Sequence, residues 1–207
     1  MLNVESITYH RDQEPILESV SLTLETGMVM MVRGGNGSGK TTLIKLLAGL
    51  LPPQDDFKVE RNGQDFDPRK PQNQSRLAYL GHTLGIKDDL TCLENLEFLA
   101  HFIGQNKDQN PVSSLEWVGL DGYQFTFARR LSAGQRKRLA LARLLLCPAQ
   151  LWILDEPYSN LDKGGIALVD RLLQGHIDAG GSAIITSHGT IEPDVSEYSE
   201  ILLESAA

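Results

Sequence analysis

The chain has 207 residues and a net charge of −8, from 19 Lys and Arg against 27 Asp and Glu. Hydrophobic residues make up 41% and charged residues 22%, which is typical of a folded globular protein and too apolar for a disordered chain. The acidic excess argues against a protein that coats nucleic acid, because such binding depends on neutralising phosphates. The length suits one domain with room for an inserted subdomain.

The composition also argues against a chain that crosses a membrane or is secreted. A spanning helix needs about 20 nearly continuous apolar residues, and the best candidate, residues 144–154, is interrupted by Pro148. Residues 1–5 lack the basic start and the apolar stretch of a signal peptide. The two cysteines, Cys92 and Cys147, each lie beside a leucine and are expected to be core thiols in a reducing compartment. We therefore expect an intracellular protein.

In chain order, the apolar pattern predicts an N-terminal hairpin followed by alternating strands and helices. Leu2 and Val4, then Val20, Leu22 and Leu24, recur at every second position, as in two paired strands. The further predicted segments are a buried strand at 28–32, a helix at 41–51, surface strands and loops at 54–75, a strand at 77–80, a helical insertion at about 83–133, a helix at 136–147, a strand at 151–154, a helix at 164–175 and a strand at 183–186. This order predicts an α/β fold with a parallel sheet between helices. Four strands end in glycine or polar residues, at the sheet edge where ligands bind.

Residues 34–41 match the phosphate-loop pattern G-x-x-x-x-G-K-[ST], between a predicted strand and a predicted helix. The glycines let backbone N–H groups curl around phosphate oxygens, and the helix adds the positive end of its dipole. Lys40 supplies a full charge to the outer phosphates, and the Thr41 hydroxyl is placed for Mg²⁺. The predicted ATP-binding residues are Gly34, Gly35, Asn36, Gly37, Ser38, Gly39, Lys40, Thr41 and Thr42. A plain glycine-rich turn is the alternative, and the flanking strand and helix argue against it.

The apolar strand at 151–154 ends in two carboxylates, Asp155 and Glu156. Asp155 can hold Mg²⁺ directly or through water. Glu156 can face the terminal phosphate and polarise an attacking water as general base. His188, after the strand at 183–186, can hydrogen-bond the γ-phosphate and orient that water. Strands also end in solvated acids or surface histidines, but the phosphate loop favours a catalytic interpretation.

A second candidate anion site precedes the helix predicted at 136–147. It consists of Leu131, Ser132, Ala133, Gly134 and Gln135. A serine, a glycine and a helix N-terminus are again the parts of a phosphate site. Since one nucleotide does not need two cradles in one chain, this segment is expected to serve a nucleotide held by another copy.

Together these segments resemble the ATP-binding cassette (ABC) family, in the same order and over essentially the whole chain. The resemblance identifies residues 131–135 as the signature motif, although Ala133 stands where a second glycine is usual, and His188 as the switch histidine. The D-loop would be Ser159, Asn160, Leu161 and Asp162. The family fold is a phosphate-loop core with an N-terminal antiparallel β part and an inserted helical subdomain, here one ATPase domain over residues 1–207. The resemblance also implies a head-to-tail homodimer that holds two ATPs, each between one phosphate loop and the partner's signature motif.

Within that family, the sequence resembles the ATPase subunits of the haem-exporter complex of bacterial cytochrome c maturation. The likeness lies in Gly81-His82, in the short tail beyond His188, and in residues 85–87, 90–91, 94–96, 131–136, 140–144 and 152–157. It implies the integral membrane partners CcmB, CcmC and CcmD and a position on the cytoplasmic face of the inner membrane. The implied role is haem export, or release of the haem-loaded chaperone CcmE.

One position departs from the general cassette pattern. After the strand at 77–80 the family normally has a glutamine that senses Mg²⁺ and water, and this chain has His82. A neutral imidazole can ligate Mg²⁺ or hydrogen-bond its water, whereas an imidazolium cannot ligate. The hypothesis is that hydrolysis weakens as His82 becomes protonated. A purely structural histidine is the alternative.

Tyr9 and Arg11 are the two candidates for stacking on adenine. Being two residues apart in a strand, they are expected to share a face. The spacing to Ile16-Leu17 favours Arg11, whereas the ring face of Tyr9 favours Tyr9. Plain hairpin surface is the third interpretation.

Two further groups of residues are interpreted more simply. The basic cluster, Arg129, Arg130, Arg136, Lys137 and Arg138, is expected to be mostly a solvated face. The aromatic residues Trp117, Tyr123, Phe125 and Phe127 are expected either to pack in the helical subdomain or to form part of a docking surface for a membrane subunit.

Three other functions stay open at this point. The ATPase of a lipid, peptide or drug transporter would share every catalytic residue, and only Gly81-His82 and the short tail argue against it. A cassette ATPase of DNA repair or translation would carry a long coiled coil or a second cassette, and the sequence shows neither. A phosphate-loop kinase would leave residues 131–135 and His188 without a role.

Overall fold

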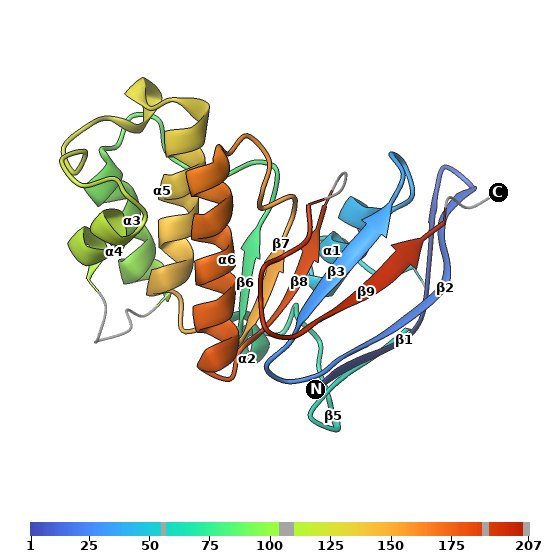
Figure 1. The fold of residues 1–207 in the computed structure, drawn as a ribbon. Coiled ribbons are helices and arrows are strands. Elements are labelled where there is room, and N and C mark those ends of the chain that lie inside the picture. The colour runs from blue at the N-terminus through green and yellow to red at the C-terminus, as the bar shows by residue number, and fades with distance from the viewer. Residues whose placement is uncertain (55–56, 104–109, 188–190, 205–207) are drawn as a thin grey trace.

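Strands and helices alternate along the chain, as the apolar pattern predicts, in a computed structural model that describes residues 1–54, 57–103, 110–187 and 191–204 (Figure 1). The elements in order are β1 (Leu2–Arg11), β2 (Glu14–Leu24), β3 (Val29–Gly34), α1 (Lys40–Leu47), β4 (Lys58–Arg61), β5 (Gln64–Asp65), α2 (Pro71–Gln74), β6 (Leu77–Leu80), α3 (Cys92–Ile103), α4 (Pro111–Trp117), the 3₁₀ turn η1 (Ala128–Arg130), α5 (Ala133–Leu146), β7 (Leu151–Leu154), α6 (Lys163–Asp178), β8 (Ser182–Thr186) and β9 (Tyr198–Leu203).

The strands form two sheets. An antiparallel sheet has the order β2-β1-β4-β5, and a parallel sheet has the order β6-β7-β8-β3-β9. Because all neighbours in the second sheet are parallel, the carboxyl ends of β3, β6, β7 and β8 meet at one edge (Figure 1). The predicted α/β fold with an antiparallel N-terminal part is confirmed.

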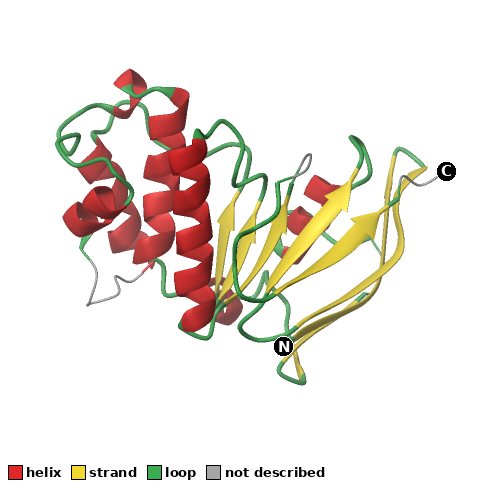
Figure 2. Cartoon of the chain, in the orientation of Figure 1, coloured by secondary structure: helices red, strands yellow, loops and turns green. Residues whose placement is uncertain are grey.

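The parallel sheet has a core on each face, which explains its apolar strands. In β7, Leu151 and Ile153 pack in the core that contains α1, and Trp152 and Leu154 pack in the core that contains α5 and α6. Figure 2 shows α5 and α6 over one face and α1 behind the other. A strand covered on both faces must be apolar at every position, so its sequence is a continuous apolar run rather than an alternating one.

The N-terminal hairpin buries one face and exposes the other. Leu2 pairs with Leu24 and Val4 with Leu22, and all four side chains are buried. The two-residue turn at residues 12–13 has φ values of 51° and 71°, the left-handed geometry that matches the twist of hairpin strands. The strands are longer than the pattern predicts, because register shifts along β1 interrupt the strict alternation.

Further elements also differ from the sequence prediction. Helix α1 ends at Leu47, before the two prolines, because Gly49 turns the chain with a φ of 71°. The short helix α2 lies in the region expected to hold only strands and loops. Strand β9 pairs parallel with β3 and was not predicted, because only Leu203 among its side chains is buried and its apolar pattern is weak.

Helices α3 and α4 pack beside α5, at the end of the molecule away from β9 (Figure 1). Their shared core includes Leu96, Leu115 and Leu139, all fully buried. Thr91 and Glu94 form a capping box at the start of α3, with each side chain accepting from the other's backbone N–H. Among the helices that the structure describes, none has the length and apolar character needed to traverse a bilayer.

Candidate functional site

The predicted phosphate loop connects β3 to α1 at the carboxyl edge of the parallel sheet. It lines a cleft of about 480 Å³, together with side chains of the N-terminal hairpin and of the segment after α1. The residues around this cleft are Arg11, Ile16, Asn36, Gly37, Ser38, Gly39, Lys40, Thr41, Thr42, Lys45 and Leu51. A glycine-rich loop that leads into a helix N-terminus within a cleft is a geometry suited to phosphate.

Gly37 and Gly39 of the loop adopt the left-handed helical conformation, with φ of 83° and 90°. Of these two, only Gly39 is also confined. A Cβ there would lie 2.6 Å from Leu17 Cδ2 and 2.8 Å from the Ile16 carbonyl, whereas a Cβ at Gly37 would meet nothing within 4 Å. The hairpin therefore packs against the loop where α1 begins.

This difference predicts unequal effects of alanine at the two positions. Gly39→Ala is expected to lower the free energy of unfolding by about 2–4 kcal/mol, since strain at a left-handed residue adds to overpacking. Gly37→Ala is the matched control and is expected to lose only about 1–2 kcal/mol, from the left-handed backbone alone. Urea denaturation of the two variants measures both values. Equal losses would contradict the close packing of the hairpin on the loop.

The Lys40 side chain lies within the loop. Its Nζ donates to the carbonyls of Gly34 and Gly35, at 2.8 and 2.7 Å. Burial lowers the pKa of Lys40, and the nearby carboxylates of Glu156 and Asp155 act in the opposite direction. In the same loop, Ser38 Oγ is buried and has no hydrogen-bond partner among the residues that the structure describes. A buried hydroxyl normally has one, so this donor fits a ligand oxygen in the loop.

Asp155 links the phosphate loop to the end of β7. Its side chain is buried, Oδ2 accepts from Thr41 Oγ1 at 3.2 Å, and Oδ1 accepts from Thr186 Oγ1 at 2.7 Å. Two of the residues predicted to bind Mg²⁺ therefore meet although they are 114 positions apart. Hydroxyl and carboxylate oxygens are ligands that Mg²⁺ prefers. Within the described part of the chain, no group of three or more His, Cys, Asp or Glu could hold a metal ion.

Glu156 follows in a strained backbone conformation. Its φ is 50°, which for a residue other than glycine costs roughly 1–3 kcal/mol. Its N–H donates to Thr186 Oγ1 at 2.9 Å, and its carbonyl accepts from Ser159 Oγ at 2.9 Å. Thr186 thus contacts both acidic residues of the site. Sequence reasoning missed its role, although a hydroxyl at the end of an otherwise apolar strand was the available signal.

The candidate signature motif begins α5. Ser132 caps the helix, which starts at Ala133 rather than at 136, and Gln135 completes a capping box by accepting from the Ser132 N–H at 2.9 Å. Ser132 and Ala133 are exposed and do not line the phosphate-loop cleft. Within one chain, the candidate signature motif therefore does not contribute to the cleft of the phosphate loop.

The candidate D-loop lies against the start of α5. A Cβ on Gly134 would lie 3.6 Å from the Asn160 carbonyl, and Leu161 is half-buried. Asp162 caps α6 by accepting from the Gly165 N–H at 2.7 Å, and it also accepts from Arg138 at 3.4 Å.

Of the remaining predicted site residues, some lie at the phosphate-loop cleft and others do not. Arg11 lines the cleft, whereas Tyr9 is half-buried against the hairpin core. The register of β1 against β2 shifts between Tyr9 and His10, and of the two candidates only Arg11 is among the residues around the cleft. His82 is exposed just beyond β6. His188 lies outside the described residues.

The structure also places one residue of the basic cluster and one of the aromatic group. Lys137 is 4% exposed and not part of a solvated basic face. Trp117 is 42% exposed at the end of α4, and the Arg171 guanidinium lies 5.6 Å from its ring centroid.

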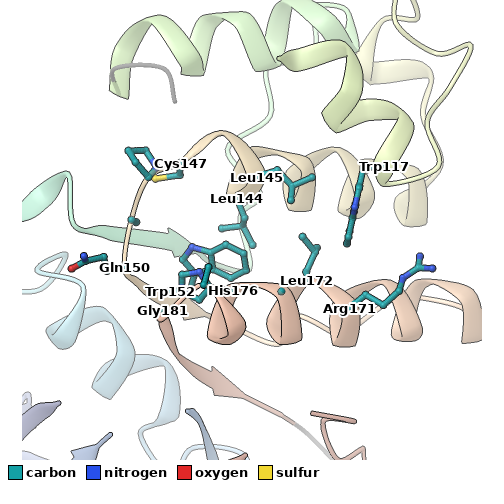
Figure 3. Close-up of a pocket in the computed structure, with 14 residues that line it drawn as sticks. Trp117, Leu144, Leu145, Cys147, Gln150, Trp152, Arg171, Leu172, His176 and Gly181 are labelled. Atoms are coloured by element: carbon teal, nitrogen blue, oxygen red, sulfur yellow. The ribbon is translucent and has the colours of Figure 1, made fainter. Parts of the chain in front are cut away.

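A second cavity, of about 400 Å³, lies between the end of α5 and helix α6, apart from the phosphate loop (Figure 3). Trp117 and Arg171 lie at one end, and Trp152 stacks on His176 at the other, with ring centroids 3.8 Å apart. His176 Nε2 lies 3.2 Å from the Ser182 carbonyl. Burial lowers the pKa of His176 to about 4, so the imidazole stays neutral at pH 7.

That buried imidazole predicts a loss of stability in acid. The unfolded chain takes up a proton at His176 near pH 6.5, and the folded chain does so only near pH 4. Stability therefore falls as the pH drops through this window, by up to about 3 kcal/mol. Urea unfolding between pH 7 and pH 4 should show a shallower decline for His176→Phe, which retains the ring stack. As a control, His10→Phe, which replaces an exposed histidine, should show the same decline as the wild type. Identical declines in all three proteins would refute the conclusion that the buried His176 imidazole causes the loss of stability in acid.

Comparisons with known proteins agree with this geometry. The model of the ABC transporter family matches residues 17–159. The chain is 44% identical over 210 residues to the cytochrome c biogenesis ATP-binding export protein CcmA of Xanthomonas axonopodis pv. citri, covering 100% of this chain and 95% of the relative. It is 45% identical over 190 residues to the CcmA protein of Nitrosococcus oceani, covering 92% and 87%.

Solved structures share the fold at lower identity. A putative ABC transporter ATP-binding protein from Pyrococcus furiosus superimposes with a TM-score of 0.80 at 24% identity, covering 98% of this chain and 96% of that one. A dimeric ATP-binding cassette bound to ADP and Pi gives a TM-score of 0.78 at 21% identity, covering 91% and 88%. The chain therefore belongs to the ABC transporter ATPase family, among the cytochrome c biogenesis ATP-binding export proteins.

Proposed function

We propose that this chain is the ATP-hydrolysing subunit of a membrane export complex in cytochrome c maturation, and that it acts as a homodimer around two ATPs. The observation that carries the proposal is the contact between Thr41 of the phosphate loop and Asp155 at the end of β7. It brings a phosphate-binding loop and a pair of acidic residues to one sheet edge. The cytochrome c role rests on relatives with that name over the full length of the chain.

In this proposal the loop holds the triphosphate. N–H groups of residues 34–42 and the Lys40 ammonium contact phosphate oxygens, and Arg11 stacks on the adenine because it lines the same cleft. Thr41 and Asp155 would hold Mg²⁺, which when bound neutralises charge on the phosphates. Glu156 accepts the proton of the attacking water as the bond to the γ-phosphorus forms and the β–γ bridge breaks. His188 is proposed as a γ-phosphate contact, and His82 as a contact to the metal or its water.

The other half of each site comes from the partner chain. Ser132 is exposed at a capped helix N-terminus, where a serine hydroxyl and the helix dipole can bind a γ-phosphate brought by a second copy. The signature motif of residues 131–135 and the D-loop of residues 159–162 would lie together at this interface. A cassette of the same fold has been solved as a dimer with ADP and Pi, which supports the arrangement.

We also propose that residues 1–207 form one ATPase domain whose helical subdomain, about 83–133, contacts a membrane subunit. Phe98 and Phe102 stack on each other on α3 and are 50% and 83% exposed, and Phe125 is 82% exposed. Exposed aromatic side chains grouped in this way are typical of interaction surfaces. The proposed partners are CcmB, CcmC and CcmD, at the cytoplasmic face of the inner membrane. The proposed output is haem export, or release of haem-loaded CcmE.

The proposal is tested by affinity purification of the full chain from the membranes of its own host. CcmB-like and CcmC-like proteins should co-purify, and a Phe98→Ser, Phe102→Ser variant should lose them while its ATP affinity stays unchanged. The matched control, Leu202→Ser, alters a 68% exposed apolar residue on β9 and should retain the partners. Recovery of a lipid, peptide or drug permease instead would reject the cytochrome c role and leave the ATPase assignment intact.

A further inference from the structure

Lys137 of α5 is a buried lysine whose ammonium reaches the backbone of Glu156. The side chain is 4% exposed, and its Nζ donates to the Glu156 carbonyl at 2.9 Å. Burial lowers the pKa of Lys137, while the carboxylates of Glu156 and Asp155 act to raise it. An apolar side chain of similar length would fill the same space without the desolvation of a charge. The ammonium therefore points to a role in holding the Glu156 peptide.

That peptide needs external support, because it carries the left-handed conformation of Glu156. Two of its contacts come from its own sheet edge: the Thr186 hydroxyl accepts from the N–H, and Ser159 donates to the carbonyl through its N–H and its hydroxyl. Lys137 adds a contact from a different layer, the helix α5. It therefore connects the position of this helix to the position of the acidic residue.

The same helix begins with the candidate signature motif. Ser132 caps α5 five residues before Lys137, and a hydrogen-bonded helix of 14 residues moves as a unit over that short distance. Gly134 of the motif lies against Asn160, four residues after Glu156. A shift of the helix start on binding a partner's phosphate would therefore move the Lys137 ammonium and the carbonyl that it holds.

We propose that Lys137 is a positioning residue that ties the general base of one nucleotide site to the signature motif that completes the other. Each chain then hydrolyses its own ATP at full rate only while its signature motif is engaged on its partner's ATP. The inference rests on the proposed dimer, and it adds a route by which one site senses the other. In thermodynamic terms, Lys137 carries part of the coupling between the two sites.

The test measures ATP turnover by the full chain in the membrane complex with which it purifies. Lys137→Met keeps the length and apolar stem and is expected to lower kcat by about 10- to 100-fold, since small displacements of a catalytic group have effects of this size. The KM for ATP should stay within about twofold, and the Hill coefficient for ATP should fall towards 1. Lys137→Arg retains a donor and should recover most of kcat. Lys70→Met, which removes a surface lysine paired with Asp65, should match the wild type.

A double-mutant cycle separates positioning from a general effect on folding. If Lys137 acts through Glu156, Lys137→Met should lower kcat no further in a Glu156→Gln background. Additive losses in the double variant would overturn the proposal. So would a Lys137→Met protein whose kcat and Hill coefficient equal those of the wild type, or a wild-type protein whose own Hill coefficient for ATP is 1. A wild-type complex without ATPase activity would instead reject the proposed function. The two failures are therefore distinguishable.

Discussion

Replacing Glu156 by glutamine is expected to lower kcat for ATP hydrolysis by about 10²–10⁴-fold, the usual contribution of a general base. The amide keeps the size and the hydrogen-bonding shape of the side chain but cannot accept the proton of the attacking water. Since Lys40, Thr41 and Asp155 are unchanged, ATP should still bind. The closed dimer should therefore accumulate with ATP and Mg²⁺ and appear at twice the monomer mass in gel filtration with light scattering.

A second substitution tests whether that dimer is the proposed sandwich. Ser132 is exposed and lies outside the cleft of its own phosphate loop, so Ser132→Arg should leave ATP binding by the monomer unchanged. In the Glu156→Gln background it should abolish the ATP-dependent dimer, because the long side chain would block the partner's phosphate. A dimer that persists in the double variant would contradict a role for residues 131–135 in the partner's site.

Replacing Lys40 by methionine is expected to lower kcat/KM for ATP by about 10²–10³-fold, the usual effect of removing one preorganised donor to developing charge. The Lys40 ammonium is already held within the loop by the carbonyls of Gly34 and Gly35, so phosphate meets a preformed charge. Methionine keeps the stem and removes the charge. Isothermal titration with ATP and steady-state hydrolysis together measure the loss in binding and in turnover.

Lys70→Met is the matched control for this prediction, since Lys70 is paired on the surface with Asp65 and lies outside the phosphate-loop cleft. Its kinetics should equal those of the wild type. Equal losses in the two variants would show that net charge, rather than the loop lysine, governs nucleotide binding.

The sequence predicted the elements of the parallel sheet well because its strands are buried on both faces. The runs at 28–32 and 151–154 contain no polar residue, and they become β3 and β7. Strand β9 was missed because it lies at the edge of the sheet, where most of its side chains are not buried. Its sequence therefore lacks the continuous apolar run of a central strand. The end of helix α1 was predicted four residues too late because it depends on the left-handed turn at Gly49, which interrupts an otherwise apolar stretch.

In the candidate site, too, features encoded by neighbouring residues could be predicted, and features that depend on contacts between distant residues could not. The phosphate loop can be predicted from eight consecutive residues, because a curled backbone needs glycines at set positions. The choice between Tyr9 and Arg11 stayed open in the sequence because spacing favoured Arg11 and ring chemistry favoured Tyr9, and only the packed hairpin shows that Arg11 is the one that lines the cleft. Thr186 and Lys137 were missed because their roles come from contacts with residues 30 and 19 positions away.

The sequence by itself determined the fold class, the phosphate loop, the acidic pair after β7 and the membership of the ABC family, because each is encoded in a short run of residues or in their order. Only the tertiary structure decided which side chains meet at the sheet edge: Thr41 with Asp155, Thr186 with both acidic residues, and Lys137 with the Glu156 carbonyl. The physical reason is that side chains distant in sequence are brought within hydrogen-bonding distance by sheet order and helix packing, which no local pattern records.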